Sequence, residues 1–246
     1  MRTAWEEAGW EQLGEGVVRR RMPGWDETIG VITGTAGIMI VDTGASIRDG
    51  AELRRSVRGV LGRDVTHVAL THPHFDHVLG TAAFAGVEVF GAAGLGELLL
   101  RRGKDELRHD AVRHGVDRDA AAEATDLLVV PHHHVHGQLT VDLGDRTVLL
   151  ANVGPGHTAH DLAVLVPGRH GAREIVFCGD LVEESGEPQA GPDALPQQWP
   201  AALDRLLALG GEEALYVPGH GAVVDAAFVR AQRDALAARF GVPRSS

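Results

Sequence analysis

The densest group of metal-competent side chains lies between Thr71 and His77, where the chain reads Thr-His-Pro-His-Phe-Asp-His. Imidazole nitrogen and carboxylate oxygen together suit zinc, with iron or manganese as alternatives. The competing interpretation is a polar loop that is rich in His by chance, since the chain has 14 His. The spacing favours a metal site instead. Its candidate ligands are His72, His74, Asp76 and His77.

The residues around this cluster predict how it is positioned. Pro73 disfavours a helical conformation at His72 and favours an extended one. Side chains of an extended segment repeat every two residues, so His72 and His74 should point the same way. Val65–Thr71 reads as a buried strand and Val78–Ala85 as a short helix. The cluster is therefore expected at a strand-to-helix junction.

Three later segments share one pattern, a strand followed by a glycine turn and a single metal-competent side chain. Glycine permits unusual backbone angles and leaves room for an ion. A lone His or Asp after Gly is usually a turn residue, but three such segments downstream of the cluster indicate further ligands. The segments are Gly154-Pro155-Gly156-His157-Thr158, Phe177-Cys178-Gly179-Asp180-Leu181 and Val217-Pro218-Gly219-His220-Gly221.

The elements that must position these residues follow from apolar periodicity. Strands are predicted at residues 16–22, 28–33, 37–41, 65–71, 87–90, 127–130, 139–143, 147–152, 162–166, 174–178 and 214–217. Helices are predicted at residues 49–61, 78–85, 94–102, 199–209 and 225–239. This order predicts an α/β protein in which two sheets pack together with helices on both outer faces. No linker interrupts the pattern, so we expect one domain over residues 1–246.

Composition narrows the class of protein. With 44% hydrophobic and 23% charged residues, the chain reads as an ordinary globular protein. A formal net charge of −11 disfavours nucleic acid as a partner. The single cysteine, Cys178, excludes an intrachain disulfide and thiol-rich zinc ribbons. The N-terminus lacks signal-peptide regions and no apolar run could span a bilayer, so we expect a cytoplasmic protein without a membrane partner.

The motifs occur in the order and at the spacings of the metallo-β-lactamase superfamily, which nearly the whole chain resembles. Val41-Asp42-Thr43-Gly44 also resembles the family's strand that ends under the site. The resemblance implies a four-layer αβ/βα sandwich with the metal site along one edge of the packed sheets. It further implies two ions. The first would be held by His72, His74 and His157, the second by Asp76, His77 and His220, and Asp180 would bridge both.

Two such cations can share a water, lower its pKa towards about 7 and present it as hydroxide to a carbonyl. Asp76 would be catalytic by orienting the hydroxide. No Gly-x-Ser-x-Gly nucleophile motif is present. The expected activity is hydrolysis of an ester, thioester, lactone or amide in a small molecule, with zinc as the expected metal and iron or manganese as alternatives.

Residues 154–167 and 177–185 resemble the binuclear zinc β-lactamases most closely, with two departures. Those enzymes usually have Cys at the position of Asp180, and usually have at the position of Glu183 the Lys that binds the antibiotic's carboxylate. A substrate-facing Glu183 would repel that carboxylate. We therefore expect β-lactamase activity to be at most weak.

An Asp at position 180 is instead typical of glyoxalase II and the acyl-homoserine lactonases. One alternative stays open, a mononuclear iron persulfide dioxygenase that uses positions of the His72, His74 or His157, and Asp180 type. A third hypothesis is a metalloprotein that binds a partner and has no enzymatic activity. The oligomeric state is not predicted.

Two further features of the sequence can be explained without a role in the metal site. The run His132–His136 looks like a second metal cluster, but adjacent His on a strand cannot all face one ion. We expect these residues to form a solvated loop at the rim of the active-site cleft. Tyr216 is expected either to be buried or to point towards substrate.

Overall fold

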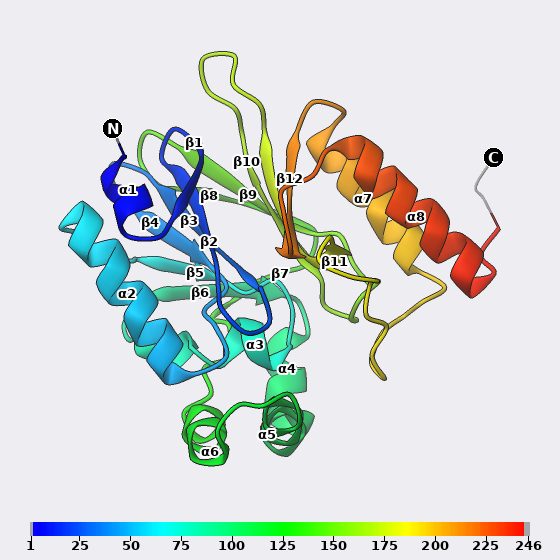
Figure 1. Ribbon diagram of the computed structural model, residues 1–246, viewed down its shortest axis with the longest axis horizontal. Helices are drawn as coiled ribbons and strands as arrows, with labels where there is room; N and C mark the ends of the chain where they lie inside the picture. Colours follow the sequence, from blue (N-terminus) through cyan, green and yellow to red (C-terminus); the bar gives the residue numbers. More distant parts are fainter. Residues whose placement is uncertain (1, 244–246) are drawn as a thin grey trace.

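Two β-sheets face each other, and helices cover the outer face of each (Figure 1). The structure, a computed structural model, describes residues 2–243. β4 (Ile38–Val41) shows how one strand serves two layers, because its side chains alternate between the sheet's faces. Ile38 and Ile40 join the apolar cluster on the helix side, whereas Met39 and Val41 join the cluster between the sheets.

The first sheet has seven strands in the order β1-β2-β3-β4-β5-β6-β7. Pairing is antiparallel from β1 to β4 and parallel from β4 to β7. Parallel neighbours need a crossover connection, which places helices on the outer face of this sheet. Its other strands are β1 (Glu11–Gly14), β2 (Val17–Arg21), β3 (Thr28–Thr33), β5 (His67–Ala69), β6 (Glu88–Ala92) and β7 (His133–Val135).

The second sheet has five strands in the order β12-β11-β10-β9-β8, antiparallel except for the β11–β12 pair. In β10, Leu162, Val164 and Val166 face the first sheet, whereas Ala163 and Leu165 face α7 and α8. The strands are β8 (Gln138–Asp142), β9 (Thr147–Asn152), β10 (Leu162–Val166), β11 (Ile175–Glu183) and β12 (Leu215–His220).

The helices fall into two groups on opposite outer faces (Figure 1). α7 and α8 cover the five-stranded sheet, where Trp199 and Leu203 are fully buried. The bounds there are α7 (Trp199–Gly210) and α8 (Ala226–Phe240). The remaining helices are α1 (Ala4–Glu7), α2 (Ile47–Leu61), α3 (Phe75–Val78), a 3₁₀ turn (Thr81–Ala83), α4 (Leu95–Leu98), a π-helical turn (Leu99–Gly103), α5 (Lys104–Arg113) and α6 (Arg118–Asp126).

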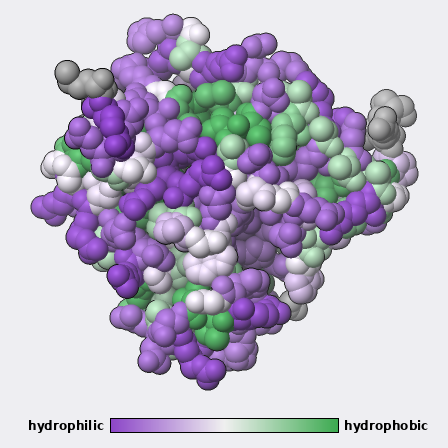
Figure 2. Space-filling model, in the orientation of Figure 1, coloured by the Kyte–Doolittle hydropathy of each residue, from purple (hydrophilic) through white to green (hydrophobic). Residues whose placement is uncertain are grey.

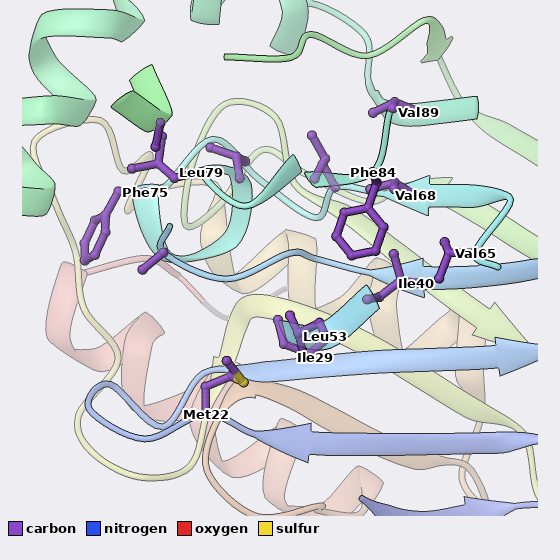
Figure 3. Close-up of a cluster of buried hydrophobic side chains, with 14 of the residues drawn as sticks. Met22, Ile29, Ile40, Leu53, Val65, Val68, Phe75, Leu79, Phe84 and Val89 are labelled. Atoms are coloured by element: carbon purple, nitrogen blue, oxygen red, sulfur yellow. The ribbon is translucent and has the colours of Figure 1, made fainter. Parts of the chain in front are cut away.

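Three apolar layers therefore separate four layers of secondary structure, which confirms the predicted αβ/βα sandwich. Figure 3 shows the layer on the helix side of the seven-stranded sheet, where Leu53 from α2 lies near Ile40 and Ile29. Phe75 and Leu79 enter the same layer from α3 and its end. Their burial anchors the segment that carries the His-rich motif.

The structure corrects several predicted elements. The helix expected at 78–85 is two short pieces, and α3 starts at Phe75, because His74 already serves as its extended N-cap residue. Residues 127–130 form no strand: Val129 and Val130 pack against the helix-side core without joining a sheet. β1, α5 and α6 were not predicted, since their sequences are short or strongly polar.

The face shown in Figure 2 is mostly hydrophilic, with hydrophobic patches between the hydrophilic regions. Among the described residues, no helix has the length and apolar character needed to cross a bilayer. The prediction of a single domain over residues 1–246 stays a prediction.

Candidate metal centre

Seven His and Asp side chains from both halves of the chain converge in two adjacent groups. The extended segment after β5 and the helix α3 supply the Thr71–His77 ligands, while the β9–β10 connection, β11 and β12 supply the others. Each residue offers one donor atom, and within each group these atoms lie within 4.8 Å of one another. The groups are His72, His74, His157 and Asp180, and Asp76, His77 and His220.

In the first group three imidazoles surround a common point. Nε2 of His157 lies 2.9 Å from Nδ1 of His74. Oδ2 of Asp180 lies 3.6 Å from Nε2 of His72 and 3.6 Å from Nε2 of His157. His72 and His157 are almost fully buried, whereas the side chain of His74 is 24% exposed.

In the second group Oδ2 of Asp76 lies 3.5 Å from Nε2 of His77 and 3.4 Å from Nε2 of His220. Asp180 reaches this group as well. Its Oδ1 is 3.3 Å from Nε2 of His77, and its Oδ2 is 3.2 Å from Nε2 of His220. The Asp180 carboxylate thus stands between the two groups, in the place that a bridging ligand requires.

The ring nitrogen that faces away from each group has its own polar partner. In metal sites such partners fix the ring orientation and the tautomer of a ligating His. The contacts are His72 Nδ1 with Thr71 Oγ1 (3.0 Å), His74 Nε2 with Asp193 Oδ2 (3.1 Å), His77 Nδ1 with Asp42 Oδ2 (2.8 Å), His157 Nδ1 with the Gln189 carbonyl (3.1 Å) and His220 Nδ1 with the Trp25 carbonyl (2.7 Å).

Three buried atoms in the middle of the site have no hydrogen-bond partner, namely His72 Nε2, His77 Nε2 and Asp180 Oδ1. Leaving such an atom unsatisfied costs about 1–3 kcal/mol, and more for a charged group. All three point into the space between the groups, where a cation would satisfy them. The residues present therefore fit divalent metal ions of the zinc type.

Burial and neighbouring charges shift the pKa values of the site's imidazoles in opposite directions. Burial lowers the pKa of His157 to about 3 and places that of His72 well below its ordinary value. Burial also acts to lower the pKa of His220, but Asp180 and Asp76 together outweigh it and raise that pKa to about 11. The pKa of the Asp180 carboxyl lies well below its ordinary value, because the surrounding imidazoles outweigh its burial. Metal ions binding here would displace protons.

The Asp42 carboxylate contacts Thr71 as well as His77, which belongs to the second group. Its Oδ1 accepts a hydrogen bond from the Thr71 amide (2.8 Å) and its Oδ2 accepts one from the Thr71 hydroxyl (2.7 Å). Its backbone φ is 61°, in the left-handed region that few residues other than Gly, Asn and Asp adopt. The segment Val41–Gly44 at the end of β4 therefore lies next to the site. The Asp42 carboxylate in this segment orients both Thr71 and His77.

The glycines beside the ligands leave room for them. A Cβ atom on Gly219 would lie 1.8 Å from Oδ1 of Asp180, where no atom can be accommodated. Gly179 has a φ of 54°, and a Cβ there would lie 2.9 Å from the Thr71 side chain. β11 also continues to Glu183 rather than ending at Cys178, so Asp180 is held within a strand.

The other residues singled out from the sequence lie as follows. Glu183, expected to face substrate, is 7% exposed, and its carboxylate accepts the Gln189 amide hydrogen, so a substrate contact stays a prediction. Tyr216 is buried and donates to the Gly211 carbonyl in the α7 layer, away from the site.

The His132–His136 run is not the loop that was expected. Its middle forms the edge strand β7, because residues 133–135 pair with β6. His133 contacts Glu88, but among the described residues no set of three or more His, Cys, Asp or Glu side chains at this edge lies close enough to hold one ion.

Sequence reasoning gave no role to Trp25, Gln189 and Asp193. Gln189 and Asp193 lie between β11 and α7, where no periodic pattern marks them. Trp25 and Gln189 act through backbone carbonyls, which leave no signature in a sequence.

The sequence matches the family described as the metallo-beta-lactamase superfamily over residues 22–220. It is 25% identical over 199 residues to a metallo-beta-lactamase type 2 of Bacillus cereus, covering 79% of this chain and 67% of that protein. It is 28% identical over 196 residues to the metallo-beta-lactamase domain-containing protein 1 of Xenopus laevis, covering 80% and 71%.

The fold is similar to that of solved metallo-β-lactamases. The enzyme from Pontibacter korlensis gives a TM-score of 0.73 at 21% identity, covering 92% of this chain and 97% of the other. The enzyme from Hirschia baltica gives a TM-score of 0.67 at 17% identity, covering 96% and 98%. Fold, family match and the paired His/Asp groups agree, and the chain belongs to the metallo-β-lactamase superfamily as a metallo-hydrolase.

Proposed function

We propose that this chain is a binuclear zinc hydrolase that cleaves an ester, thioester, lactone or amide in a small molecule. The observation that carries the proposal is the Asp180 carboxylate, whose two oxygens lie within 3.2–3.6 Å of imidazole nitrogens in both ligand groups. A bridging carboxylate offsets the repulsion between two neighbouring cations. In this proposal His72, His74 and His157 hold the first ion, and Asp76, His77 and His220 hold the second.

When bound, two divalent cations supply a water of lowered pKa and polarise the substrate carbonyl. The chain's own contribution is to orient that water. The pKa of the Asp76 carboxyl is held well below its ordinary value, because His77 and His220 outweigh its burial. Asp76 is therefore ionised at neutral pH and can accept a hydrogen bond from the attacking water.

Two features argue against anionic antibiotics as the main substrates. The Lys that binds the antibiotic's carboxylate in the β-lactamase branch is absent, because Glu183 stands at its position. The Asp193 carboxylate lies against His74, where its charge would repel an anionic ligand. Three of the relatives are named metallo-beta-lactamases, and for this chain we propose β-lactam hydrolysis as a weak side activity at most.

The complete second ligand group favours two ions over one. A mononuclear iron persulfide dioxygenase would need only the first group, yet Asp76, His77 and His220 also bring three donor atoms within 4.8 Å of one another. Metal analysis distinguishes the two functions. About two zinc ions per chain support the hydrolase, whereas one iron with oxygen-dependent turnover supports the dioxygenase.

The test is metal content together with turnover on thioesters, lactones, esters and β-lactams. His157→Ala should lose about one metal per chain and abolish hydrolysis, since it removes a ligand of the first ion. His136→Ala serves as control, because its exposed imidazole lies outside both groups. Full activity in the His157 variant would show that the first ion is assigned wrongly.

A further inference from the structure

We propose that Glu183 is a positioning residue for the first metal ion and acts on His157 through the peptide group of Gln189. The proposal rests on the proposed function only in taking His157 as a metal ligand. It gives Glu183 a role other than substrate recognition, and it links that role to two hydrogen bonds in series.

The two hydrogen bonds meet at one residue. Oε1 of Glu183 accepts the Gln189 amide hydrogen at 2.8 Å. The carbonyl of Gln189 accepts the Nδ1 hydrogen of His157 at 3.1 Å. Both ends are shielded from water, since His157 is 2% exposed and Glu183 is 7% exposed. The carboxylate that replaces the lysine of related enzymes is therefore directed at the chain's own backbone.

Glu183, at one end of the two hydrogen bonds, is held in place by neighbouring elements. The Glu183 amide donates to Oε1 of Gln232 in α8 (3.2 Å), whose Nε2 donates to the Leu181 carbonyl (2.7 Å). Glu183 is also paired with His220 in the β11–β12 register. A rigid strand thus holds the carboxylate, whereas Gln189 lies in an irregular segment that has to be fixed from outside.

The hydrogen bonds also act electronically. Because the Gln189 N–H donates to Glu183, the Gln189 carbonyl oxygen becomes more negative, since hydrogen bonds in series polarise one another. That oxygen holds the proton on Nδ1 of His157 more strongly. Nε2 then stays free of a proton and becomes a better metal ligand, as with carboxylates that contact a ligating His directly.

Two substitutions test the hydrogen bond to Gln189. Glu183→Ala removes the acceptor of the Gln189 amide. Glu183→Gln keeps an oxygen that can accept it. Glu187→Gln is the control, a carboxylate in the same segment whose side chain is 73% exposed. Each change is made in His220→Ala protein, which lacks a ligand of the second group, so that zinc at the first group is measured alone.

The measurement is zinc affinity by competition with a chromophoric chelator, with solvent exchange of the His157 Nδ1 proton followed by NMR. We expect Glu183→Ala to weaken zinc binding about tenfold, the scale found for outer partners of metal ligands, and to speed the exchange. Glu183→Gln should keep slow exchange and lose less affinity. The Glu187→Gln control should match the parent protein.

Unchanged affinity and exchange in Glu183→Ala, with the fold intact by circular dichroism, would overturn the proposal. So would a Glu183→Gln variant that exchanges as fast as Glu183→Ala, because the tether would then be irrelevant. These outcomes are separate from a failure of the proposed function, which would appear as the absence of tight zinc binding in the wild-type chain.

Discussion

Oδ2 of Asp42 lies 2.8 Å from Nδ1 of His77, and the same carboxylate also accepts two hydrogen bonds from Thr71, the residue before His72. One side chain at the end of β4 therefore orients a candidate ligand of the second ion and fixes the start of the segment that carries the first. Its left-handed backbone conformation directs it there.

Asp42→Asn should weaken binding of the second ion about tenfold, because the amide tolerates the left-handed backbone but loses the charge that holds the His77 proton on Nδ1. Zinc titration of the variant measures this. Asp26→Asn is a matched control with a φ of 63° and an ion pair to Arg21. Wild-type affinity in the Asp42 variant would show that His77 needs no such partner.

Asp180→Asn should leave the chain folded but weaken binding of the second metal and remove most hydrolysis at neutral pH. The neutral amide keeps the shape of the side chain and cannot offset the repulsion between two cations. Asp180→Cys should keep a metal ligand and part of the activity. Metal stoichiometry and rate are measured on both. Two tightly bound metals and full turnover in the Asn variant would remove Asp180 from the ligand set.

Gly219→Ala should disrupt the metal site, since its Cβ would fall 1.8 Å from Oδ1 of Asp180 and must displace the carboxylate. Gly59→Ala is the contrasting change. Gly59 lies exposed in α2 with no atom within 4 Å of the added Cβ, and Ala should stabilise the helix by about 1 kcal/mol. Thermal unfolding and zinc content compare the two. Normal zinc binding in Gly219→Ala would contradict the tight packing described around Asp180.

Asp161 should make stability depend on pH. Burial raises the pKa of its carboxyl to about 7, against the hydrogen bonds from Thr158. Since the unfolded value is near 3.9, the folded chain holds an extra proton between about pH 4 and pH 7. The stability due to this group is therefore present at pH 4 and lost as the pH rises through 7.

Asp161→Asn cannot ionise and escapes that loss. The free energy of unfolding of the variant relative to wild type should rise with pH across this window, by up to about 1.4 kcal/mol per pH unit. Chemical denaturation of the metal-free proteins at several pH values measures it. Asp119→Asn, an exposed carboxylate in α6, should show a flat difference. A flat difference for Asp161→Asn as well would mean that Asp161 stays ionised.

The candidate ligands could be read from the sequence because they are local. His72, His74 and His77 fall within one short segment, and the later ligands stand beside glycines that a crowded site requires. The strands that carry them have simple apolar patterns, so the sandwich itself was predictable. Family resemblance added the pairing of the ligands into two groups.

The features that the sequence did not predict involve residues that are far apart in the sequence, or the hydrogen-bonding partners of the backbone. Asp193 is 119 residues from His74, and no pattern in its segment connects them. Residues 127–130 look like a strand because they are apolar, yet they bury those side chains against the helix-side core without a pairing partner. α5 and α6 carry many charges, which hid their short buried faces.

Two of the imidazoles, those of His157 and His220, are oriented by the main-chain carbonyls of Gln189 and Trp25. A carbonyl belongs to every amino acid, so replacing either side chain leaves the acceptor in place as long as the backbone keeps its path. Position 189, where the side chain is exposed, is therefore free to change during evolution in a way that Asp42 is not, whereas Trp25 is also held by its ring contact with Phe75. Surface segments next to the metal centre can thus diversify, and substrate preference with them, while the ligand geometry is inherited unchanged.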